Sequence, residues 1–485
     1  MPTTAIAVGL IVAIALVSIF AARVVYFLNK TTNTSVQSVI NAINPAPVYA
    51  PGTIGYHLEH KDQTVNLLLV GYGGAENDAP YLTDSIMVVR LNPATKQVAL
   101  ISIPRDLWVS IDTGAGTYTG KINSAFELGT DESGWYQNPK LKATRYQGKD
   151  GGGHLAEDTI SKYTGIKFDG YIGVDFKAFR DVVDALGGIT IHMDGPLDDC
   201  HYPDYHSGYL NHGVPPGYAC PPGAGIHFPS GTYAVNGEQA LEIARSREAS
   251  EPEQATDFGR ARRQQMEMAS IKQKAVSING IVKAPQLMDA LQKNFKTDLA
   301  LDDLKALYDW GKGTDDSAYL HFALSSDLML QGGINACANY DGQYTLCPED
   351  RTYVTIKNYF SHTFPPLSLA KTHTNLEVVW SGYQQTATET ATMFRTYGFQ
   401  VADPAYVRTG TTSTTVYDFS GGQQPDQLSF LTDLLSGELG HAPVVVNAAD
   451  PNAKIPAAIT NNQGFVIFAG TDWRYCWVGS AYCKR

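Results

Sequence analysis

The sequence predicts a layered α-β-α fold with a central mixed sheet, followed by a smaller C-terminal α/β domain and preceded by one transmembrane helix. Short apolar runs separated by turn residues begin at Val65, amphipathic helical stretches follow them, and the same alternation restarts near Leu376. Short apolar runs bounded by turns are typical of buried strands, and strands that alternate with helices indicate α/β layers. The chain has 485 residues, which is enough for two or three domains.

Residues 1–30 predict an uncleaved membrane anchor. An apolar run extends from Ala5 to Ala22 and continues after Arg23 to Leu28, long enough to cross a bilayer as a helix. A cleaved signal peptide is the alternative, but no basic segment precedes the run and no small-x-small cleavage site follows it. Residues 31–60 are polar and then rich in Pro and Gly, so we interpret them as a linker.

The cysteines indicate on which side of the membrane the chain lies. Arg23 and Lys30 lie at the C-terminal side of the apolar run, and the positive-inside rule would place the rest of the chain in the cytoplasm; two charges do not decide the orientation. The six cysteines fall into three local pairs, Cys200/Cys220, Cys337/Cys347 and Cys476/Cys483. Close pairs behind an anchor are typical of loop-stapling disulfides in an oxidising compartment. We therefore expect a single-pass protein of the cell membrane with its body outside the cytoplasm; the nearest-neighbour pairing is one of several connectivities.

The charge balance argues against nucleic acid as the main partner. The formal net charge is −12, and an acidic surface repels nucleic-acid phosphates at long range. A transcription regulator would also need its basic helix inside the cell, which the anchor and the cysteine pairs oppose.

The first domain is predicted over residues 61–360. Its expected strands are "VNLLLV", "SIMVVRL", "QVALISI" and "ITIHM". Its expected helices are "LAEDTISKYTG", "DFKAFRDVVDALGG", "NGEQALEIARSR", "APQLMDALQKNF" and "ALDDLKALYDWGK". In the second of these helices apolar residues recur at helical spacing from Phe176 to Leu186, and Gly187-Gly188 ends it.

A second domain is predicted over residues 376–485, after a linker at 361–375. The strands expected there are "LEVVWSG", "TTVYDFSG", "APVVV" and "GFVIFAG", and the helices are "TATETATMFRTYGF" and "PDQLSFLTDLLSGEL". This second alternation of strands and helices predicts another, smaller α/β unit.

The segment "SIMVVRLNPATKQVALISIPRD" predicts a hairpin. Asn92-Pro93 opens a turn, because Pro pre-sets φ for the first central turn position. If residues 93–96 form a four-residue loop, Asn92 faces Gln97, and Asp84 lies opposite Arg105. Directly opposed residues have Cβ atoms about 5 Å apart. A carboxylate and a guanidinium should meet at the open end of the hairpin unless a bulge shifts the register; a structural ion pair is the alternative meaning of that contact.

Five arginines gather in "IARSREASEPEQATDFGRARRQQ", residues 243–265. Arg260 and Arg263 share one face of a helix for which Asp257 is a candidate N-cap, while Arg262 points elsewhere. Arg245 and Arg247 share one side if "ARSR" is extended. Arginine suits bidentate capture of phosphate because it is planar and always charged. A solvated charged loop is the alternative, because acidic residues are interspersed.

Six segments in order resemble the LytR-CpsA-Psr family of cell-wall glycopolymer ligases. They are "NLLLVG", "LTDSIMVVRLNPATKQVALISIPRDLWV", "KINSAF", "GYIGVDFKAFRDVVDALGGITI", "LEIARSR" and "DFGRARRQQ", and they cover about residues 61–275. Residues 376–475, ending in "GFVIFAGTDW", resemble the LytR C-terminal-like domain often appended to such proteins.

The resemblance implies an anchored enzyme with its body outside the cytoplasm. Such an enzyme transfers a glycopolymer, a teichoic acid or a capsule polymer, from a polyprenyl-pyrophosphate carrier to peptidoglycan through a phosphodiester link, with Mg²⁺ (or Mn²⁺). The family holds the pyrophosphate with arginines and the prenyl tail in an apolar channel. Carried over by motif, the clamp is Arg105, Arg245, Arg247, Arg260 and Arg263.

The same resemblance assigns the acidic residues. Asp84 would help hold the metal, Asp257 would belong to the same site, and Asp106 or Asp84 would activate the acceptor hydroxyl. The family usually carries an Asp two residues after the glycine that ends the first strand, where this chain has Gly73. Asp78 is then the candidate replacement for that metal ligand.

Two other functions use the same residues. A hydrolase would release the lipid-linked polymer to water, and a non-catalytic surface protein would only bind polyprenyl phosphates. A hydrolase would cleave the lipid-linked polymer whether or not peptidoglycan is present, whereas a ligase requires peptidoglycan as the acceptor. A binding protein would show no turnover in either case.

Overall fold

The computed structural model describes most of the chain beyond the predicted anchor. The described residues are 38, 47–75, 77, 79–131, 142–202, 223–277, 295–324, 329–337, 342–348, 353–380, 391–402, 405–406, 413–459 and 463–473. Asp78, Cys220, Cys476, Cys483 and residues 284–294 of a predicted helix lie outside them, as does the apolar N-terminal run. Within the described ranges, no helix combines the length and the apolar character needed to span a membrane.

The centre of the structure is a mixed sheet, as the sequence predicts, and it has six strands; the predicted strand at Ile189–Met193 (β7) pairs with β10 (Gly231–Val235) in a separate sheet. The order of the central sheet is β11 (Phe295–Thr297), β6 (Gly170–Asp175), β1 (Val65–Tyr72), β2 (Thr83–Asn92), β3 (Gln97–Ser102) and β12 (Tyr319–Ala323). The pairs β1–β6 and β3–β12 are parallel, and the other neighbours are antiparallel. The carboxyl ends of β1 and β6 therefore meet at one edge of the sheet.

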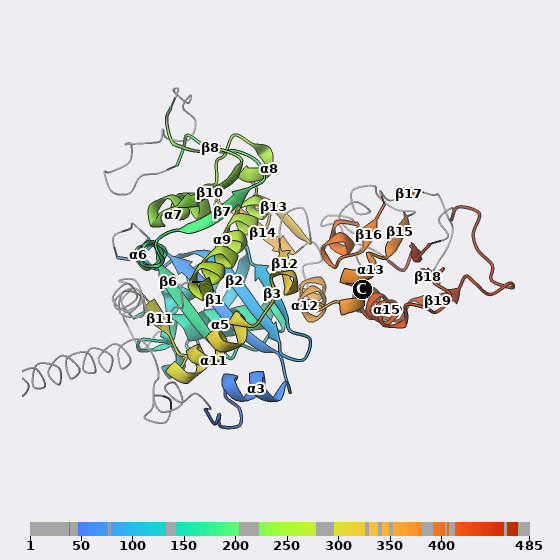
Figure 1. Cartoon of the computed structure of the whole chain (residues 1–485), viewed down its shortest axis with the longest axis horizontal. Helices are drawn as coiled ribbons and strands as arrows, with labels where there is room; N and C mark the ends of the chain where they lie inside the picture. Colours follow the sequence, from blue (N-terminus) through green and yellow to red (C-terminus); the bar gives the residue numbers. More distant parts are fainter. Residues whose placement is uncertain are drawn as a thin grey trace, which may run out of the picture.

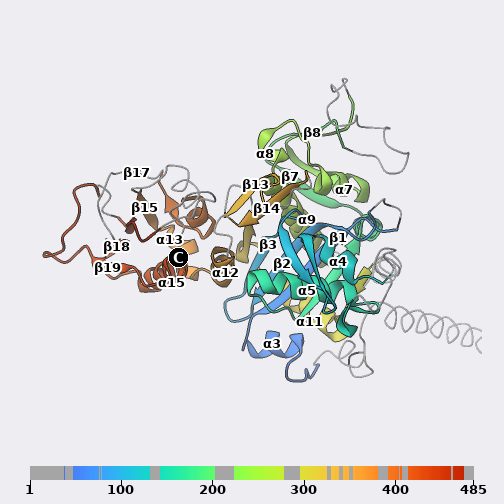
Figure 2. The ribbon, with the colours of Figure 1, turned by 180° about the vertical axis from the view of Figure 1, so that it is seen from behind.

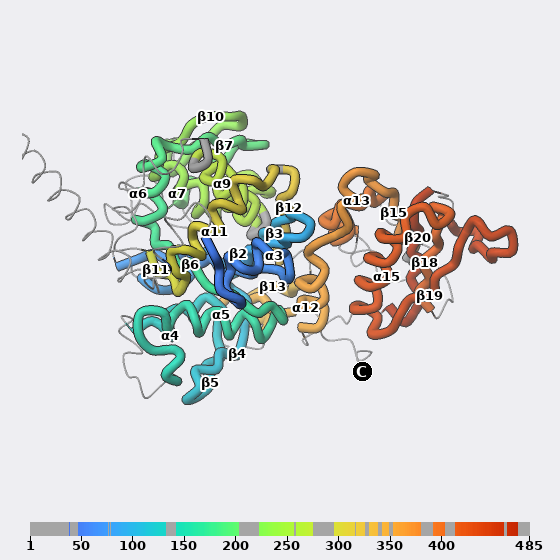
Figure 3. Tube along the Cα trace, turned by 60° about the horizontal axis from the view of Figure 1, so that its bottom comes forward, coloured from blue at the N-terminus to red at the C-terminus, as the bar shows by residue number. Residues whose placement is uncertain are grey.

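Helices cover both faces of this sheet. Leu68 and Val70 of β1 pack into one core with α4 (Ser124–Gly129) and α5 (Gly151–Thr164). Val65 and Leu67, which point the opposite way because strand side chains alternate, pack into another core with α3 (Ile54–His60) and α11 (Leu301–Lys312). Figure 3 shows the sheet between α5 on one side and α9 and α11 on the other.

A second group of elements lies beside the first in Figure 1, around the long helix α9 (Asp257–Ser277). Its other members are α6 (Phe176–Leu186), β7 (Ile189–Met193), β8 (Leu197–Asp199), β9 (Ile226–Phe228), β10 (Gly231–Val235), α7 (Gly237–Arg245) and α8 (Pro252–Ala255). Gln265 ties α9 to the sheet, since its Nε2 donates to the carbonyls of Leu100 at 3.2 Å and Phe322 at 2.9 Å.

The prediction that Asp257 caps α9 is wrong. The helix already includes Asp257, and the hydroxyl of Thr256 accepts the backbone N–H of Gly259 at 2.9 Å. A Thr hydroxyl satisfies an otherwise unpaired N–H of the first turn as well as a carboxylate does, and the sequence offers both side by side.

The remaining elements of the first part form small hairpins and short helices. They are β4 (Trp108–Asp112), β5 (Thr117–Lys121), η2 (Thr144–Tyr146), η3 (Asp316–Ala318), β13 (Leu330–Ile334) and β14 (Tyr344–Pro348).

The C-terminal part contains a second sheet, of order β16 (Gln400–Val401), β15 (Asn375–Trp380), β20 (Phe465–Phe468), β18 (Thr415–Asp418) and β19 (Val444–Asn447), with β17 (Ala405–Tyr406) beside β15. The helix α15 (Pro425–Leu439) packs against α12 (Val354–Ser361) and α13 (Leu367–Thr372). Phe360 of α12 shares one apolar core with Leu68 of β1 and Phe465 of β20. The two sheets are thus joined through α12, which lies between them in Figure 2.

The predicted disulfide between Cys337 and Cys347 is not formed. Cys347 lies opposite Gln331 in the β13–β14 hairpin, whereas Cys337 follows the end of β13 at Ile334. The three residues from Gln331 to Ile334 already span about 10 Å of strand, and a disulfide needs Cα atoms within about 7 Å. Cys200 is disulfide-bonded.

Candidate functional site

Five of the nine predicted site residues line one cavity of about 550 Å³. It lies between the ends of β1 and β2 and the helices α6, α7 and α9. The five are Asp84, Arg105, Arg245, Arg247 and Arg260. Much of the remaining lining is apolar and includes Leu69, Met87, Ile172, Phe179, Leu241 and Met268. One cavity therefore combines four guanidiniums with an apolar wall.

The hairpin places Asp84 and Arg105 as its turn predicts. Asn92 pairs with Gln97, and the same register continues to Met87 and Ser102. Beyond the last paired residues, the Arg105 guanidinium forms a hydrogen-bonded ion pair with Asp84 Oδ1. The predicted contact at the open end of the hairpin is confirmed.

Asp106 lies behind the arginines and is not among the cavity-lining residues. Its side chain contacts Lys121 Nζ at 2.6 Å, Arg105 Nε at 3.5 Å and an Arg247 terminal nitrogen at 3.7 Å. Burial alone would raise the pKa of Asp106, but the Lys121 hydrogen bond and the charges of Arg105 and Arg247 outweigh it and lower this pKa. The carboxylate therefore stays ionised and holds two clamp arginines in place.

The turn that carries Arg245 and Arg247 is shaped by Asp199, which is fully buried. Its Oδ2 accepts hydrogen bonds from Ser246 Oγ at 2.7 Å and from the Arg247 N–H at 3.1 Å. The Arg245 guanidinium stacks 4.1 Å from the Phe176 ring centre and donates to the Tyr202 hydroxyl at 3.3 Å. Sequence reasoning missed Asp199, because nothing in its local spacing links it to a turn nearly fifty residues later.

Arg263 does not reach the cavity, although it shares a helix face with Arg260. Its side chain is 2% exposed and donates to the carbonyls of Ile243, Ser246 and Gln254 at 2.8, 2.6 and 2.8 Å. Burial lowers the pKa of Arg263 to about 10. This guanidinium fastens α9 to the end of α7, so its role here is to position the arginine-bearing turn.

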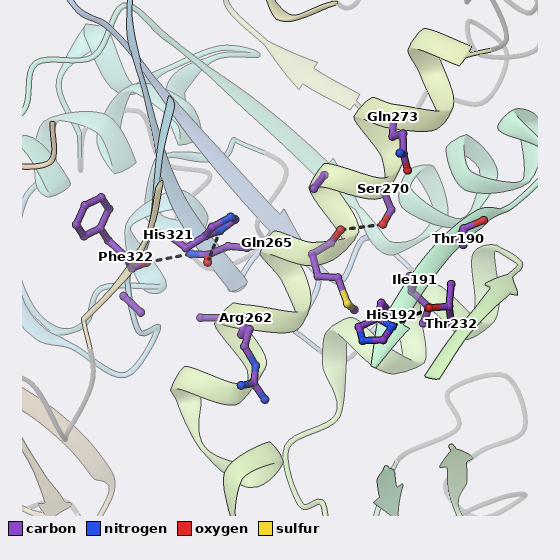
Figure 4. A pocket seen from close by; sticks show the side chains of 14 residues that line it. Thr190, Ile191, His192, Thr232, Arg262, Gln265, Ser270, Gln273, His321 and Phe322 are labelled. Carbon is purple, nitrogen blue, oxygen red and sulfur yellow. Dashed lines mark hydrogen bonds between the residues drawn. The ribbon is translucent and has the colours of Figure 1, made fainter. Parts of the chain in front are cut away.

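Arg262 lines a different cavity, of about 540 Å³, beside α9. Figure 4 shows it with Gln265, Ser270 and Gln273 of the same helix and with His192 of β7. Different residues of α9 line this cavity and the arginine cavity, and their spacing along the helix places the two cavities on different helix faces. The prediction that Arg262 points away from the clamp is confirmed.

Besides Asp199, sequence reasoning missed two carboxyl groups with raised pKa values that line the arginine cavity. Asp175 ends β6 opposite Tyr72 of β1, and its Oδ1 accepts the Ala178 N–H at 2.7 Å as the cap of α6. Burial raises the pKa of Asp175 to about 6. Glu267, on α9, is fully buried, and burial raises its pKa well above the ordinary value. The pairing of β1 with β6 was the signal that could have identified Asp175, because parallel strands end at one edge.

The glycines after β1 have different constraints. Gly74 has φ 83°, and a Cβ there would lie 2.8 Å from Asp175 Oδ2, so only glycine leaves room for that carboxylate. A Cβ at Gly73 would lie 2.8 Å from the Cβ of Asn77, whose Nδ2 donates to the Gly73 carbonyl at 2.6 Å. The loop is therefore packed for glycine at the position where the family usually has Asp. Asp78 and the side chain of Asp257 lie outside the described part of the chain.

The fold and the cavity define a layered α/β protein in which four arginines and an apolar wall line one cavity. Residues 25–334 match the model of the LytR_cpsA_psr family, which is more than half of the chain. The chain belongs to the LytR_cpsA_psr family.

Curated relatives include two proteins named polyisoprenyl-teichoic acid–peptidoglycan teichoic acid transferase TagU. That of Bacillus mycoides strain KBAB4 is 28% identical over 244 residues, which are 50% of this chain and 63% of the relative. That of Oceanobacillus iheyensis is 27% identical over 250 residues, 52% of this chain and 63% of the relative. The matched region thus spans 63% of the length of these relatives. Among solved structures, Bacillus subtilis TagV is 21% identical with a TM-score of 0.43, over 63% of this chain and 99% of that one.

Arg263→Ala should destabilise the fold far more than Arg262→Ala. Removing the buried guanidinium leaves three carbonyls without their donor, which costs on the order of 3 kcal/mol. Arg262 is exposed, and its loss should change the free energy of unfolding by no more than about 0.5 kcal/mol. Urea-induced unfolding of the two variants measures the difference, and equal stabilities would contradict the structural role of Arg263.

Asp175→Asn should flatten the pH dependence of anion binding. Asn also caps helices, so α6 should persist. In the unchanged protein, Asp175 ionises as the pH rises through about 6, which adds a negative charge to the cavity and weakens the binding of inorganic pyrophosphate in the absence of metal ions. The variant lacks this charge at every pH.

Isothermal titration calorimetry between pH 5 and 7.5 compares the two proteins. The affinity lost on raising the pH should be smaller in Asp175→Asn. Parallel profiles would show that the Asp175 carboxylate does not sense the bound anion.

Proposed function

We propose that this protein transfers a glycopolymer from a polyprenyl-pyrophosphate carrier to peptidoglycan through a phosphodiester link. The observation that carries the proposal is the single cavity with four arginines and an apolar wall. A pyrophosphate diester keeps two negative charges and its prenyl chain is apolar, so one ligand needs both kinds of lining. The names of the TagU relatives support the same substrate class.

The proposed reaction is a displacement at phosphorus. A peptidoglycan hydroxyl oxygen attacks the phosphorus that bears the sugar, the bond from that phosphorus to the bridging oxygen breaks, and polyprenyl phosphate leaves. Negative charge builds on the leaving phosphate, where the preorganised guanidiniums of Arg105, Arg245, Arg247 and Arg260 would stabilise it without further reorganisation.

The hydroxyl proton would go to Asp84 rather than to Asp106. Asp84 lines the cavity, and its Oδ1 is engaged by Arg105, which leaves Oδ2 for the proton. Asp106 is 4% exposed, and three cations lower its pKa, so it is a weak and inaccessible base. Asp106 would act through the arginines that it positions.

The donor set of the cavity fits Mg²⁺. Asp84 and Asp175 supply carboxylate oxygens to one space, and Mg²⁺ commonly binds one or two carboxylates together with substrate phosphates and water. When bound, the ion would supply charge neutralisation at the pyrophosphate. Asp175 would hold it together with Asp84, whose Oδ2 would bind the ion only while it carries no proton.

The predicted anchor would hold this cavity beside the outer face of the cell membrane. A polyprenyl carrier lies in that membrane and peptidoglycan lies outside it, so both substrates would be within reach there.

Arg105→Ala should lower the rate of transfer by about 10²-fold or more, because it removes a guanidinium that would stabilise the negative charge developing on the leaving phosphate. Arg262→Ala is the matched control, since it removes an arginine of α9 that lines the other cavity. The assay incubates the purified full chain with a polyprenyl-pyrophosphate-linked glycopolymer and Mg²⁺, with and without peptidoglycan, and measures polymer attached to the wall material.

Each outcome of this assay separates the candidate functions. Attachment that requires peptidoglycan and is lost in Arg105→Ala supports the ligase. Release of polymer at the same rate without peptidoglycan would instead indicate a hydrolase, and binding without turnover would indicate a carrier-binding protein. Full activity of Arg105→Ala would show that the reaction does not take place in the arginine cavity.

A further inference from the structure

Three potential metal ligands meet at the far end of β6 from the arginine cavity. His154 and Glu157 lie one turn apart on α5, and Asp298 follows β11. Their ligand atoms all lie within 4.8 Å of one another, with His154 Nε2 3.7 Å from Asp298 Oδ2. Residues three apart on a helix share a face, so the helix presents an imidazole and a carboxylate to the same point.

The imidazole is oriented as a metal ligand would be. His154 Nδ1 lies 3.1 Å from the carbonyl oxygen of Arg145, which can only accept, so Nδ1 carries the proton. In the neutral imidazole the lone pair is then on Nε2, the atom that faces Asp298. Without a metal, the hydrogen bond to Asp298 raises the pKa of His154, so binding of a cation would displace the Nε2 proton. A histidine that binds a metal usually donates its other ring N–H to a carbonyl or carboxylate in this way.

Asp298 is fixed from behind in the same manner. Its Oδ1 accepts the backbone N–H of Tyr171 at 2.8 Å, at the start of β6. Its Oδ2 is the oxygen that faces His154. The backbone of the central sheet thus orients this carboxylate.

Hydrogen bonds within the cluster account for His154 and Asp298 but not for the buried carboxyl group of Glu157. Its side chain is 5% exposed, and its Oε1 has no hydrogen-bond partner. Burial, together with the negative charge of Asp298, raises the pKa of Glu157 to about 8. A buried carboxyl oxygen without a partner is costly, and a cation held between the three side chains would satisfy it.

We propose that His154, Glu157 and Asp298 form a binding site for a divalent transition-metal ion, with Zn²⁺ as the best-fitting ion. One imidazole and two carboxylates match zinc chemistry, with Zn–N and Zn–O distances of about 2.0–2.2 Å and water completing the coordination. Ligand atoms in such a site lie about 3.3 Å apart, so modest side-chain rotations would close the present spacing. The hard, all-oxygen preference of Mg²⁺ and Ca²⁺ makes the imidazole a poor ligand for them.

This site is distinct from the cavity of the proposed transferase. Tyr171, which orients Asp298, begins β6, whereas Asp175 ends it, and the strand between them is about 13 Å long. The bound ion would join α5 to the segment between β11 and α11, two parts of the chain that are far apart in sequence. Its role would be to fix these elements, independently of the transfer reaction.

The test measures zinc bound to the full chain. The purified protein, without an affinity tag, is stripped with a chelator and dialysed against ZnCl₂, with MgCl₂ and CaCl₂ in parallel, and bound metal is quantified by mass spectrometry. Glu157→Gln and Asp298→Asn remove ligand charge at the site. Asp158→Asn is the matched control on α5, because its side chain bonds Arg145 instead. Asp84→Asn removes a carboxylate from the arginine cavity.

The unchanged protein, Asp158→Asn and Asp84→Asn should each bind one Zn²⁺ with similar affinity, and Glu157→Gln and Asp298→Asn should bind it at least about tenfold more weakly. Co²⁺ in place of Zn²⁺ should give visible absorption bands that the same two variants lack. Zinc should also raise the melting temperature of the unchanged protein and not that of Glu157→Gln. Absence of bound zinc, or retention of it in Glu157→Gln, would overturn the proposal and leave the cluster as a His154–Asp298 ion pair beside a neutral Glu157.

Discussion

Repulsion among guanidiniums constrains the arginine cavity, and the buried carboxylate of Asp106 is what relieves it. Arg105 comes from the end of β3 and Arg247 from the turn after α7, yet both contact the same carboxylate, which Lys121 also holds. Burial would favour the neutral acid, but three cations keep Asp106 ionised. The anion therefore compensates the arginines before any ligand arrives, and it sets the distance between two segments that the sequence separates widely.

Backbone carbonyls and N–H groups complete this arrangement. Asp199 accepts from the turn that carries Arg247, and Arg263 donates to carbonyls at both sides of the same turn. One buried anion and one buried cation thus hold the turn from opposite directions. Arg263 is not among the residues that line the cavity. Asp199 lines the cavity, but its Oδ2 accepts the backbone N–H groups of Arg247 and Glu248, so both side chains act on the backbone of the turn.

Local chemistry made part of this predictable from sequence. The Asn-Pro turn fixes the register of β2 and β3, so the contact of Asp84 with Arg105 followed from counting residues. Hydrophobic periodicity predicted β1, β2, β3, β7 and the helices α5, α6 and α7, whereas the short strands β4, β5, β8, β9 and β10, the helix α4 and the central strand β6 were not predicted. Helical spacing placed Arg260 and Arg263 on one face but could not show how deep each lies, which depends on α7 and α8 packing over that face. Asp175 and Asp199 escaped notice because their partners come from strand pairing and from a distant turn. The predicted Cys337–Cys347 disulfide was wrong because the two residues, although close in sequence, lie at different positions along the β13–β14 hairpin.

The three buried carboxyls with raised pKa values differ in what surrounds them, and this difference decides their roles. Asp175 has a backbone N–H at one oxygen and lies at the edge of the arginine cavity, so its charge can respond to an anion. Glu267 lines the same cavity as Met268 and Leu241, and its burial favours the neutral acid, which adds no charge to that wall. Glu157 faces an imidazole nitrogen and a second carboxylate, and both are held by the backbone with an atom turned toward it. A neutral carboxylic acid can line an apolar wall without a partner. Three ligand atoms that converge on one point, by contrast, are all satisfied only when a cation binds between them. The same shift in pKa therefore indicates an apolar surface in one place and a metal site in another.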